Sequence, residues 1–209
     1  MPVIHEQFRQ YRASLQEDRR RLLERFEIVD AARKVVGVGS VGTRCWVLLL
    51  SGNDDDSDPL FLQYKEAQRS VLAPYTKTPP WECEGKRVVV GQRLIQGAPD
   101  IFLGWGIQID ATHFYMRQLR DMKGSWEFDP GSTLVKRIAE YCKLCGWALA
   151  LAHAKSGDAA TIAGYLGKSE GMDDAITRFA AAYAEQSDRD YDALVKAAKA
   201  KRIPVAKAS

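Results

Sequence analysis

Three glycines in one short segment constrain the fold of this chain more than any other feature. Gly37, Gly39 and Gly42 lie within residues 34–50. A dinucleotide-binding turn needs a strand before such glycines and a helix after them, because the pyrophosphate lies at the helix N-terminus. Residues 43–50 are instead β-branched, aromatic and aliphatic, which favours a second strand. The sequence therefore predicts a hairpin of two strands joined by a glycine loop.

A lysine follows this hairpin on the next predicted strand. Lys65 ends the apolar run of residues 60–65, which comes after the acidic turn of residues 53–58. In protein kinases a glycine-rich hairpin lies over the nucleotide phosphates, and a nearby strand supplies a lysine to them. We therefore expect a nucleotide-binding site formed by Gly37, Gly39, Ser40, Gly42 and Lys65. The alternative is that the glycines only permit a tight hairpin and that Lys65 is a solvated charge at a strand end.

The order of the expected elements gives an α+β fold. The chain should begin with a helix over residues 5–29, followed by strands at 34–38, 43–50 and 60–65, a helix at 85–96 and strands at 101–109 and 113–119. These strands make a five-stranded antiparallel sheet, which resembles the amino-terminal lobe of a kinase in its content. In such a lobe Gln118, at the end of the last strand, becomes a hinge residue whose backbone meets the adenine edge.

From residue 132 onward the pattern is helical throughout. A long helix with an apolar stripe should end near residues 153–157, and Asp158 is a good N-cap for a next helix that closes at Gly164 or Gly167. Two further helices are expected at 172–186 and 188–201. The predicted domains are an N-terminal helix (1–33), a glycine-loop sheet lobe (34–124), a helical lobe (125–203) and a frayed tail (204–209).

The carboxylates that a phosphotransferase needs do not follow the glycine loop. His153 and Asp158 invite comparison with a catalytic loop, but that loop also needs an asparagine five positions after the aspartate, and position 163 is alanine. No Asp-Phe-Gly segment comes after it. We therefore expect Asp158 to cap a helix, and we assign no catalytic residue and no metal ligand.

The composition indicates which partners and which cellular compartment to expect. A net charge of +3 gives no support for a nucleic-acid partner, and the arginines at 19–21 lie among acidic residues, as on a solvated helix face. Four scattered cysteines indicate a reducing compartment, with Cys142 and Cys145 expected to be buried thiols. No apolar run reaches a membrane span of about 20 residues, and the charged N-terminus is unlike a signal peptide. We expect a cytoplasmic protein with no membrane partner.

Several longer segments carry a family resemblance. They are residues 32–42, 58–67, 91–96, 102–105, 117–124, 145–158 and 164–167. Together they resemble a large bacterial family catalogued as domain of unknown function 2252, and the resemblance covers nearly all of residues 8–203. The chain resembles the carboxy-terminal half of that family.

The resemblance implies a permuted kinase-like phosphotransferase. Complete members carry an upstream half with Gly-Asp-x-His-x-x-Asn-Phe-like and Asn-Asp-Phe-Asp-like segments, which look like a catalytic loop and a metal-binding segment. This chain would then contain the lobe that binds ATP, and carboxylates of a second chain would bind Mg²⁺. Val90 occupies the position where a glutamate partner for Lys65 is expected, which leaves Glu66, Glu82 and Glu84 as alternatives.

Two other classes of function stay open at this point. In one, the chain is a non-catalytic interaction domain whose basic helix segments at 19–21 and 196–202 dock a partner protein. In the other, the same basic residues bind nucleic acid, which would make the affinity fall steeply with salt.

Overall fold

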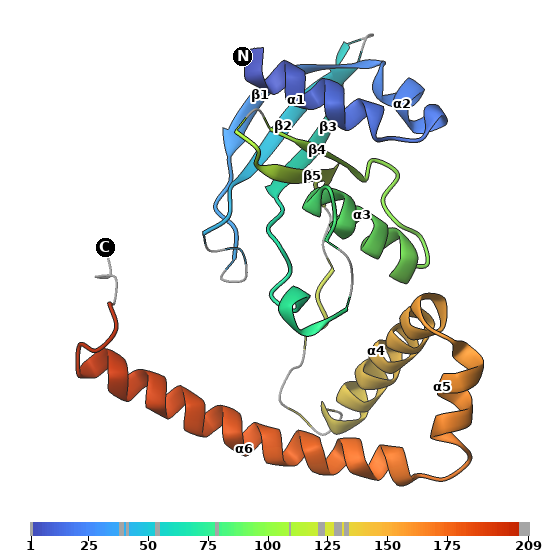
Figure 1. The fold of residues 1–209 in the computed structure, drawn as a ribbon, viewed down its shortest axis with the longest axis vertical. Helices are drawn as coiled ribbons and strands as arrows, with labels where there is room; N and C mark the ends of the chain where they lie inside the picture. The colour runs from blue at the N-terminus through green and yellow to red at the C-terminus, as the bar shows by residue number, and fades with distance from the viewer. Residues whose placement is uncertain are drawn as a thin grey trace. The chain divides into compact units, whose positions relative to one another are not determined.

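The computed structural model describes residues 2–37, 40, 42–52, 55–77, 80–108, 110–120, 124–127, 131 and 134–204, and the side chains of residues 2–5 and 55–57 lie outside the description. The fold is the predicted one: N-terminal helices, a five-stranded antiparallel sheet and then helices (Figure 1). The chain divides into two compact units, Met1–Gly157 and Asp158–Ser209.

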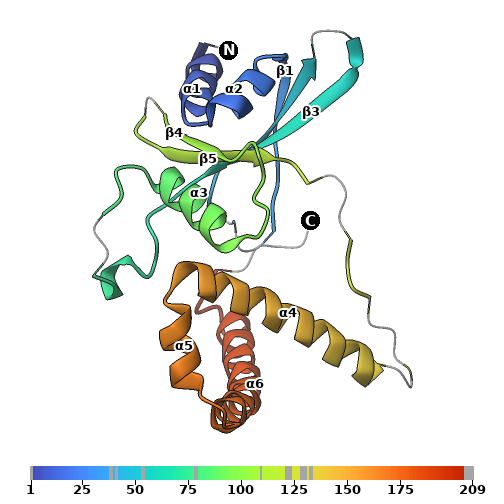
Figure 2. The ribbon, with the colours of Figure 1, turned by 90° about the vertical axis from the view of Figure 1, so that its right-hand side faces the viewer.

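The first unit holds the sheet. Its elements are α1 (Pro2–Ala13), α2 (Glu17–Leu23), β1 (Phe26–Arg33), β2 (Cys45–Gly52), β3 (Asp55–Glu66), the short 3-10 turn Ala73–Tyr75, α3 (Glu84–Ile95), β4 (Gly104–Ile107), β5 (His113–Gln118) and α4 (Leu134–Ser156). The strands lie in the order β1-β2-β3-β5-β4, and every neighbouring pair is antiparallel. Figure 2 shows α1 and α2 on one side of the sheet and α3 on the other.

One face of the sheet forms the core with α1 and α2. Alternate residues of β2, β3 and β5 point to this face, because successive side chains of a strand face opposite ways. The buried cluster consists of Phe8, Tyr11, Leu15, Leu23, Leu48, Leu50, Leu60, Leu62, Tyr64, Phe102, Phe114 and Met116. The face is therefore closed by helices from the N-terminal segment of the same chain.

The predicted helix over residues 5–29 and the predicted strand at 34–38 are both wrong. The segment forms two helices and then β1, in which Phe26 pairs with Gly52 and Ile28 with Leu50. Apolar residues three or four apart fit one long helix or a helix followed by a strand equally well, and pairing with β2 decides for the strand. Residues 34–37 have no regular structure.

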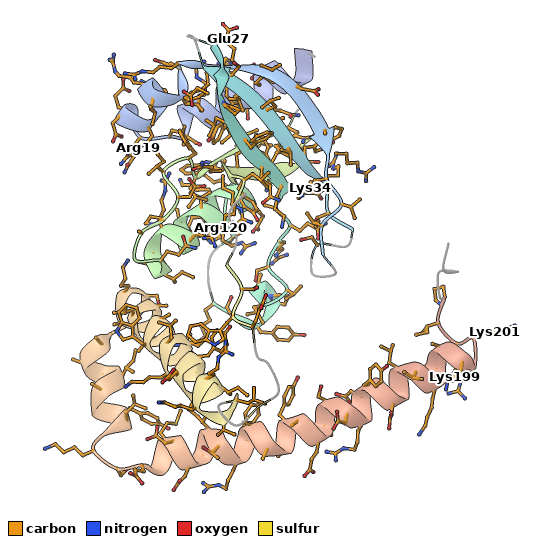
Figure 3. The ribbon with its side chains drawn as sticks, turned by 180° about the vertical axis from the view of Figure 1, so that it is seen from behind. Arg19, Glu27, Lys34, Arg120, Lys199 and Lys201 are labelled. Atoms are coloured by element: carbon orange, nitrogen blue, oxygen red, sulfur yellow. The ribbon has the colours of Figure 1, made fainter. Side chains whose placement is uncertain are left out.

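The arginines of α2 pair with the acidic residues beside them, as expected for a solvated face. Arg19 lies 3.3 Å from Asp18 and Arg21 lies 3.0 Å from Glu17, which also pairs with Arg20. Figure 3 shows Arg19 at the surface.

Helix α1 covers the free edge of β4. The backbone N–H of Trp105 donates to Ser14 Oγ at 2.8 Å, and that of Ile107 donates to Gln10 Oε1 at 3.0 Å. Tyr11 Oη donates to the Phe102 carbonyl at 2.7 Å. Edge strands expose unpaired backbone groups. Here the side chains of Gln10 in α1 and of Ser14, which follows the helix, replace the partner strand.

Helix α3 packs against β4 and β5 at very close range. A Cβ on Gly85 would lie 1.9 Å from the Phe114 carbonyl oxygen and 3.1 Å from the Trp105 Cβ. Val89, one helical turn further along, is fully buried. Glycine at position 85 therefore sets how near the helix comes to the strand.

Helix α4 does not bury its apolar stripe. None of its residues is buried, and Trp147 is 62% exposed. Cys142 and Cys145 are exposed as well, so the expectation of two buried thiols is wrong. The apolar periodicity predicted the helix correctly, but it could not supply a surface for the stripe to pack on.

The second unit consists of α5 (Ala159–Leu166) and α6 (Gly171–Lys199). Asp158 caps α5 as predicted, because its carboxylate accepts from the backbone N–H groups of Ala160 and Thr161. The helix closes at Gly167, whose φ of 64° is in the left-handed region. The two helices predicted at 172–186 and 188–201 are one helix, α6, and the Gln186 side chain bonds to both Arg189 and Asp190 across the expected break.

Replacing Gly85 with alanine should destabilise the protein by about 1–3 kcal/mol, because the new methyl group overpacks the α3–β5 contact. The matched control is Gly91→Ala in the same helix, where a Cβ meets nothing within 4 Å. That substitution should stabilise the helix by roughly 0.5–1 kcal/mol. Urea unfolding of both variants checks the prediction, and equal effects at the two positions would contradict it.

Candidate functional site

The structure brings the predicted lysine to the glycine loop. Lys65 Nζ donates to Ser40 Oγ at 3.1 Å, although the two residues are 25 positions apart in the chain. Lys65 pairs with Cys45 on β2 and with Tyr115 on β5, so it lies inside the sheet and not at an edge. Its neighbour Tyr64 faces the helical core, which places Lys65 on the opposite face.

The glycine loop joins β1 to β2 through two short turns. The Ser40 N–H donates to the Gly37 carbonyl at 2.9 Å, and the Thr43 N–H and Oγ donate to the Ser40 carbonyl at 3.1 and 2.7 Å. Gly42 has a φ of 82°, which a residue with a side chain adopts only with strain. Gly39 lies outside the described residues.

Unlike Gly42, Gly37 has no backbone conformation that requires a glycine. A Cβ on Gly37 would meet nothing within 4 Å, and its φ is not in the left-handed region. Neither packing nor backbone conformation within the described residues therefore demands a glycine at this position. Free space above the backbone is what a loop needs if a ligand is to approach its N–H groups.

Arg44 holds the end of the loop against two other segments. Its Nε donates to Glu66 Oε2 at 3.0 Å and its Nη1 to Asp110 Oδ2 at 3.1 Å, and Nη2 bonds to the Thr112 hydroxyl. The Arg44 backbone N–H also donates to Glu66, at 3.2 Å. This network fixes the start of β2 to the end of β3 and to the β4–β5 turn.

The network lowers the pKa of Glu66 and raises the pKa of Arg44. Burial alone would raise the pKa of Glu66, but hydrogen bonds from Arg44 and Gln68 outweigh it, so the pKa is lowered. The pKa of Arg44 is raised by the hydrogen bonds to Glu66 and Asp110. Both groups are therefore held in their charged forms.

The three glutamates considered as partners of Lys65 do not take that role. Glu66 pairs with Arg44, and Glu84 pairs with Arg87 of the same helix. In the part of the chain that the structure describes, no ion pair joins Lys65 to Glu82 either. Sequence reasoning missed Arg44, whose importance arises only when strand pairing places it beside Glu66.

A polar row lies beside Lys65 on the same face. Gln63 is buried, and its Oε1 accepts from Arg117 Nε and Nη2 at 3.1 and 3.0 Å. Its Nε2 lies 3.5 Å from the Cys45 Sγ. Polar residues at positions 63 and 65 within an apolar strand were the available signal, and it points to a polar face on the central strand.

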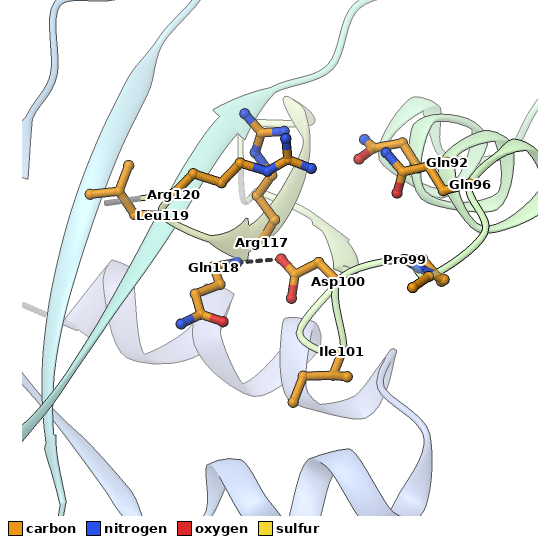
Figure 4. Close-up of a pocket in the computed structure, with 10 residues that line it drawn as sticks. Gln92, Gln96, Pro99, Asp100, Ile101, Arg117, Gln118, Leu119 and Arg120 are labelled. Atoms are coloured by element: carbon orange, nitrogen blue, oxygen red, sulfur yellow. Dashed lines mark hydrogen bonds between the residues drawn. The ribbon is translucent and has the colours of Figure 1, made fainter. Parts of the chain in front are cut away.

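Gln118 lies at the end of β5, as predicted, and lines a cavity of about 420 Å³. Figure 4 shows this cavity between β5 and α3, with Arg117 and Arg120 on one side and Gln92 and Gln96 on the other. The Gln118 N–H donates to Asp100 Oδ2 at 2.6 Å. The hinge amide predicted to meet an adenine edge thus already has an acceptor, which a ligand would have to replace.

The site residues therefore fall into two neighbouring groups. Ser40 and Lys65 are in contact, whereas Gln118 pairs with Leu62, three residues along β3 from Lys65. That separation is roughly 10 Å along a strand. Arg117 lines the cavity and bonds to Gln63, which lies two residues from Lys65 on β3.

Comparison with known families settles the relationship that the segments suggested. The sequence matches uncharacterized proteins conserved in bacteria, the DUF2252 family, over residues 2–197. The chain belongs to the DUF2252 family. No curated protein and no solved structure gives a significant match. Family membership does not by itself assign a reaction to the DUF2252 fold.

Neither a metal-ligand cluster nor a membrane-spanning helix occurs among the described residues. Across these residues, no group of three or more His, Cys, Asp or Glu side chains could hold a metal ion. None of the described helices is long and apolar enough to cross a membrane.

Neutralising Glu66 should weaken the dependence of the free energy of unfolding on pH in the acidic range. Because the folded-state pKa of Glu66 is lowered, its charge contributes stability above the unfolded-state pKa, and that stability is lost as the pH falls through the folded-state value. Glu66→Gln should cost roughly 1 kcal/mol at neutral pH and little near pH 3. Urea midpoints between about pH 3 and 7 measure this.

The control for this experiment is Glu185→Gln, which removes an exposed ion pair 3.8 Å long on α6. It should follow the wild-type pH profile. If Glu66→Gln follows that profile too, the network around Arg44 does not stabilise the folded state in the way described.

Proposed function

We propose that this chain is a kinase-like nucleotide-binding module that binds ATP through the glycine loop and Lys65. The observation that carries the proposal is the 3.1 Å contact between Lys65 Nζ and Ser40 Oγ. A lysine on the central strand that reaches the tip of a glycine loop is the arrangement that places a cation beside loop-bound phosphates. The order of elements, with α3 between the lysine strand and the last two strands, supports the same comparison.

The residues would divide the work of binding as follows. Gly37, Gly39 and Gly42 let the loop backbone approach the phosphates, and Ser40 lies at the loop tip. Lys65 would exchange its bond to the Ser40 hydroxyl for a phosphate oxygen, which forms a charge-assisted hydrogen bond. Gln118 lies at the end of β5, where the adenine would bind. Phosphate recognition by this chain therefore rests on backbone donors and one ammonium group.

Mg²⁺ is expected to accompany the nucleotide, but this chain does not supply a binding site for it alone. Mg²⁺ is usually held by one or two carboxylates together with the substrate phosphates. Among the described residues, no group of three or more His, Cys, Asp or Glu side chains could hold a metal ion without the phosphates. In the proposal, the metal-binding and catalytic carboxylates belong to an upstream half of the family or to a second chain, so this module binds nucleotide without turning it over.

A second candidate function is a non-catalytic interaction domain. It rests on the aromatic and aliphatic side chains that α4 and α6 expose, with Trp147 of the first unit 62% and Phe179 of the second unit 66% exposed. Large exposed apolar side chains that recur along a helix are typical of surfaces that bind partners. This function predicts no response to nucleotide.

Lys65→Ala should weaken ATP binding about 10- to 100-fold, because a hydrogen bond to a charged group contributes about 1.5–3 kcal/mol. Isothermal titration of the purified chain with ATP, with and without Mg²⁺, measures the effect. Lys168→Ala, on the second unit, is the control for loss of a positive charge and should bind like the wild type. If ATP gives no heat with the wild-type chain at millimolar concentration, the interaction-domain function takes precedence.

Gly37→Val should leave the melting temperature unchanged and weaken ATP binding at least tenfold. A Cβ at position 37 meets nothing within 4 Å, and the valine side chain should occupy the space from which a phosphate would approach the loop. Thermal unfolding and titration of the same sample separate the two effects. A variant that loses stability but binds ATP normally would show that the glycine is structural.

A further inference from the structure

A second cavity lies on the opposite face of the sheet from Lys65. Its volume is about 280 Å³, and its lining includes Gln7 of α1, Trp46 and Leu48 of β2, Tyr64 of β3, Gln108 after β4 and Met116 of β5. Every lining residue belongs to the first unit. The nucleotide proposal uses none of them.

The floor of this cavity is one cross-strand row. Trp46 pairs with Tyr64, and Tyr64 pairs with Met116, so the three side chains lie next to one another on the same face. Tyr64 is 3% exposed, whereas Trp46 is 37% exposed. The row therefore offers an apolar floor with an indole that solvent can reach.

Tyr64, which lines this cavity, carries an unused hydrogen-bond donor. Among the described residues, its hydroxyl is a buried side-chain polar atom with no hydrogen-bond partner. Burial raises the pKa of Tyr64, which keeps the phenol neutral and its proton available for donation. The ring stacks on Phe114 with centroids 4.7 Å apart, so the hydroxyl is held in place. A buried hydroxyl without a partner calls for an explanation, because phenylalanine would fill the same space without it.

The charges around the cavity favour a neutral ligand. Arg44 also lines the cavity, but its guanidinium pairs with both Glu66 and Asp110. The remaining polar lining consists of the Gln7 and Gln108 amides. No net positive charge therefore remains to attract an anion, while amide and phenol groups suit an amide or carbonyl oxygen.

We propose that this cavity binds a small, neutral, planar aromatic molecule with an amide or carbonyl group, whose ring packs on Trp46, Leu48 and Met116 and whose oxygen accepts from Tyr64 Oη. The volume is just below the range of about 300–1,000 Å³ typical of ligand pockets, which limits the ligand to one or two rings. Because Tyr64 and Lys65 face opposite sides of β3, this ligand and ATP would contact different side chains of that strand.

Benzamide, benzoate and toluene are the probes, and saturation-transfer NMR with the full chain is the measurement. Benzamide should bind with millimolar or better affinity, and toluene, which lacks the acceptor, about tenfold more weakly. Benzoate should also bind more weakly, because the cavity offers its charge no partner. Equal binding of all three probes, or no binding of benzamide, would overturn the proposal.

Tyr64→Phe tests the hydroxyl directly. The variant should be as stable as the wild type or more stable, since it removes an unpartnered polar atom, and its affinity for benzamide should fall to that for toluene. Tyr115→Phe, a tyrosine on the other face of the sheet, is the matched control and should bind benzamide normally. Unchanged benzamide binding by Tyr64→Phe would show that the hydroxyl does not contact the ligand.

Two further variants separate this site from the nucleotide site. Ala31→Leu adds bulk at a residue that lines the cavity and should abolish binding of benzamide and toluene alike. Lys65→Ala should leave benzamide binding unchanged, whatever it does to ATP. Loss of benzamide binding in a folded Lys65→Ala variant would contradict the independence of the two sites.

Discussion

The pairing of β3 with β2 on one side and β5 on the other fixes the strand residues of both candidate sites. Because β3 is the central strand, its residues alternate between two faces with no freedom to shift register. Tyr64 turns into the helical core beside Trp46 and Met116, and Lys65 turns to the face that the glycine loop reaches. A slip of one residue would exchange the two and destroy both sites at once.

The charge network around Arg44 connects that strand pairing to the loop. Arg44 immediately precedes β2, and its contacts with Glu66 and Asp110 hold the last residue of β3 and the β4–β5 turn. The same contacts remove Glu66 as a partner of Lys65 and leave the lysine to the Ser40 hydroxyl. They also neutralise the Arg44 guanidinium, which lines the aromatic cavity. One guanidinium therefore influences the electrostatics on both faces of the sheet.

The helical parts of the chain contribute differently from the sheet. Helix α1 completes the core and covers the β4 edge, so it belongs to the fold of the sheet. Helix α4 has no buried residue, and the same is true of α6 in the second unit. Their long helical periods are clear in the sequence, but the stability of these helices in water does not come from burial within the described chain. Figure 3 labels Lys199 and Lys201 near the end of this helical segment.

The sequence by itself determined the local features of this protein. Glycines followed by a β-branched run gave the loop and β2, the apolar run gave β3 with Lys65 at its end, and Asp158 and Gly167 marked the two ends of α5. Each depends on neighbours within a few residues, whose conformational preferences are intrinsic. The family followed from longer segments of the same kind. Tertiary structure alone decided that residues 26–33 form a strand, that Glu66 pairs with Arg44, that the Tyr64 hydroxyl finds no hydrogen-bond partner among the described residues and that α4 is exposed. These outcomes depend on which distant segments meet, and no local preference encodes that.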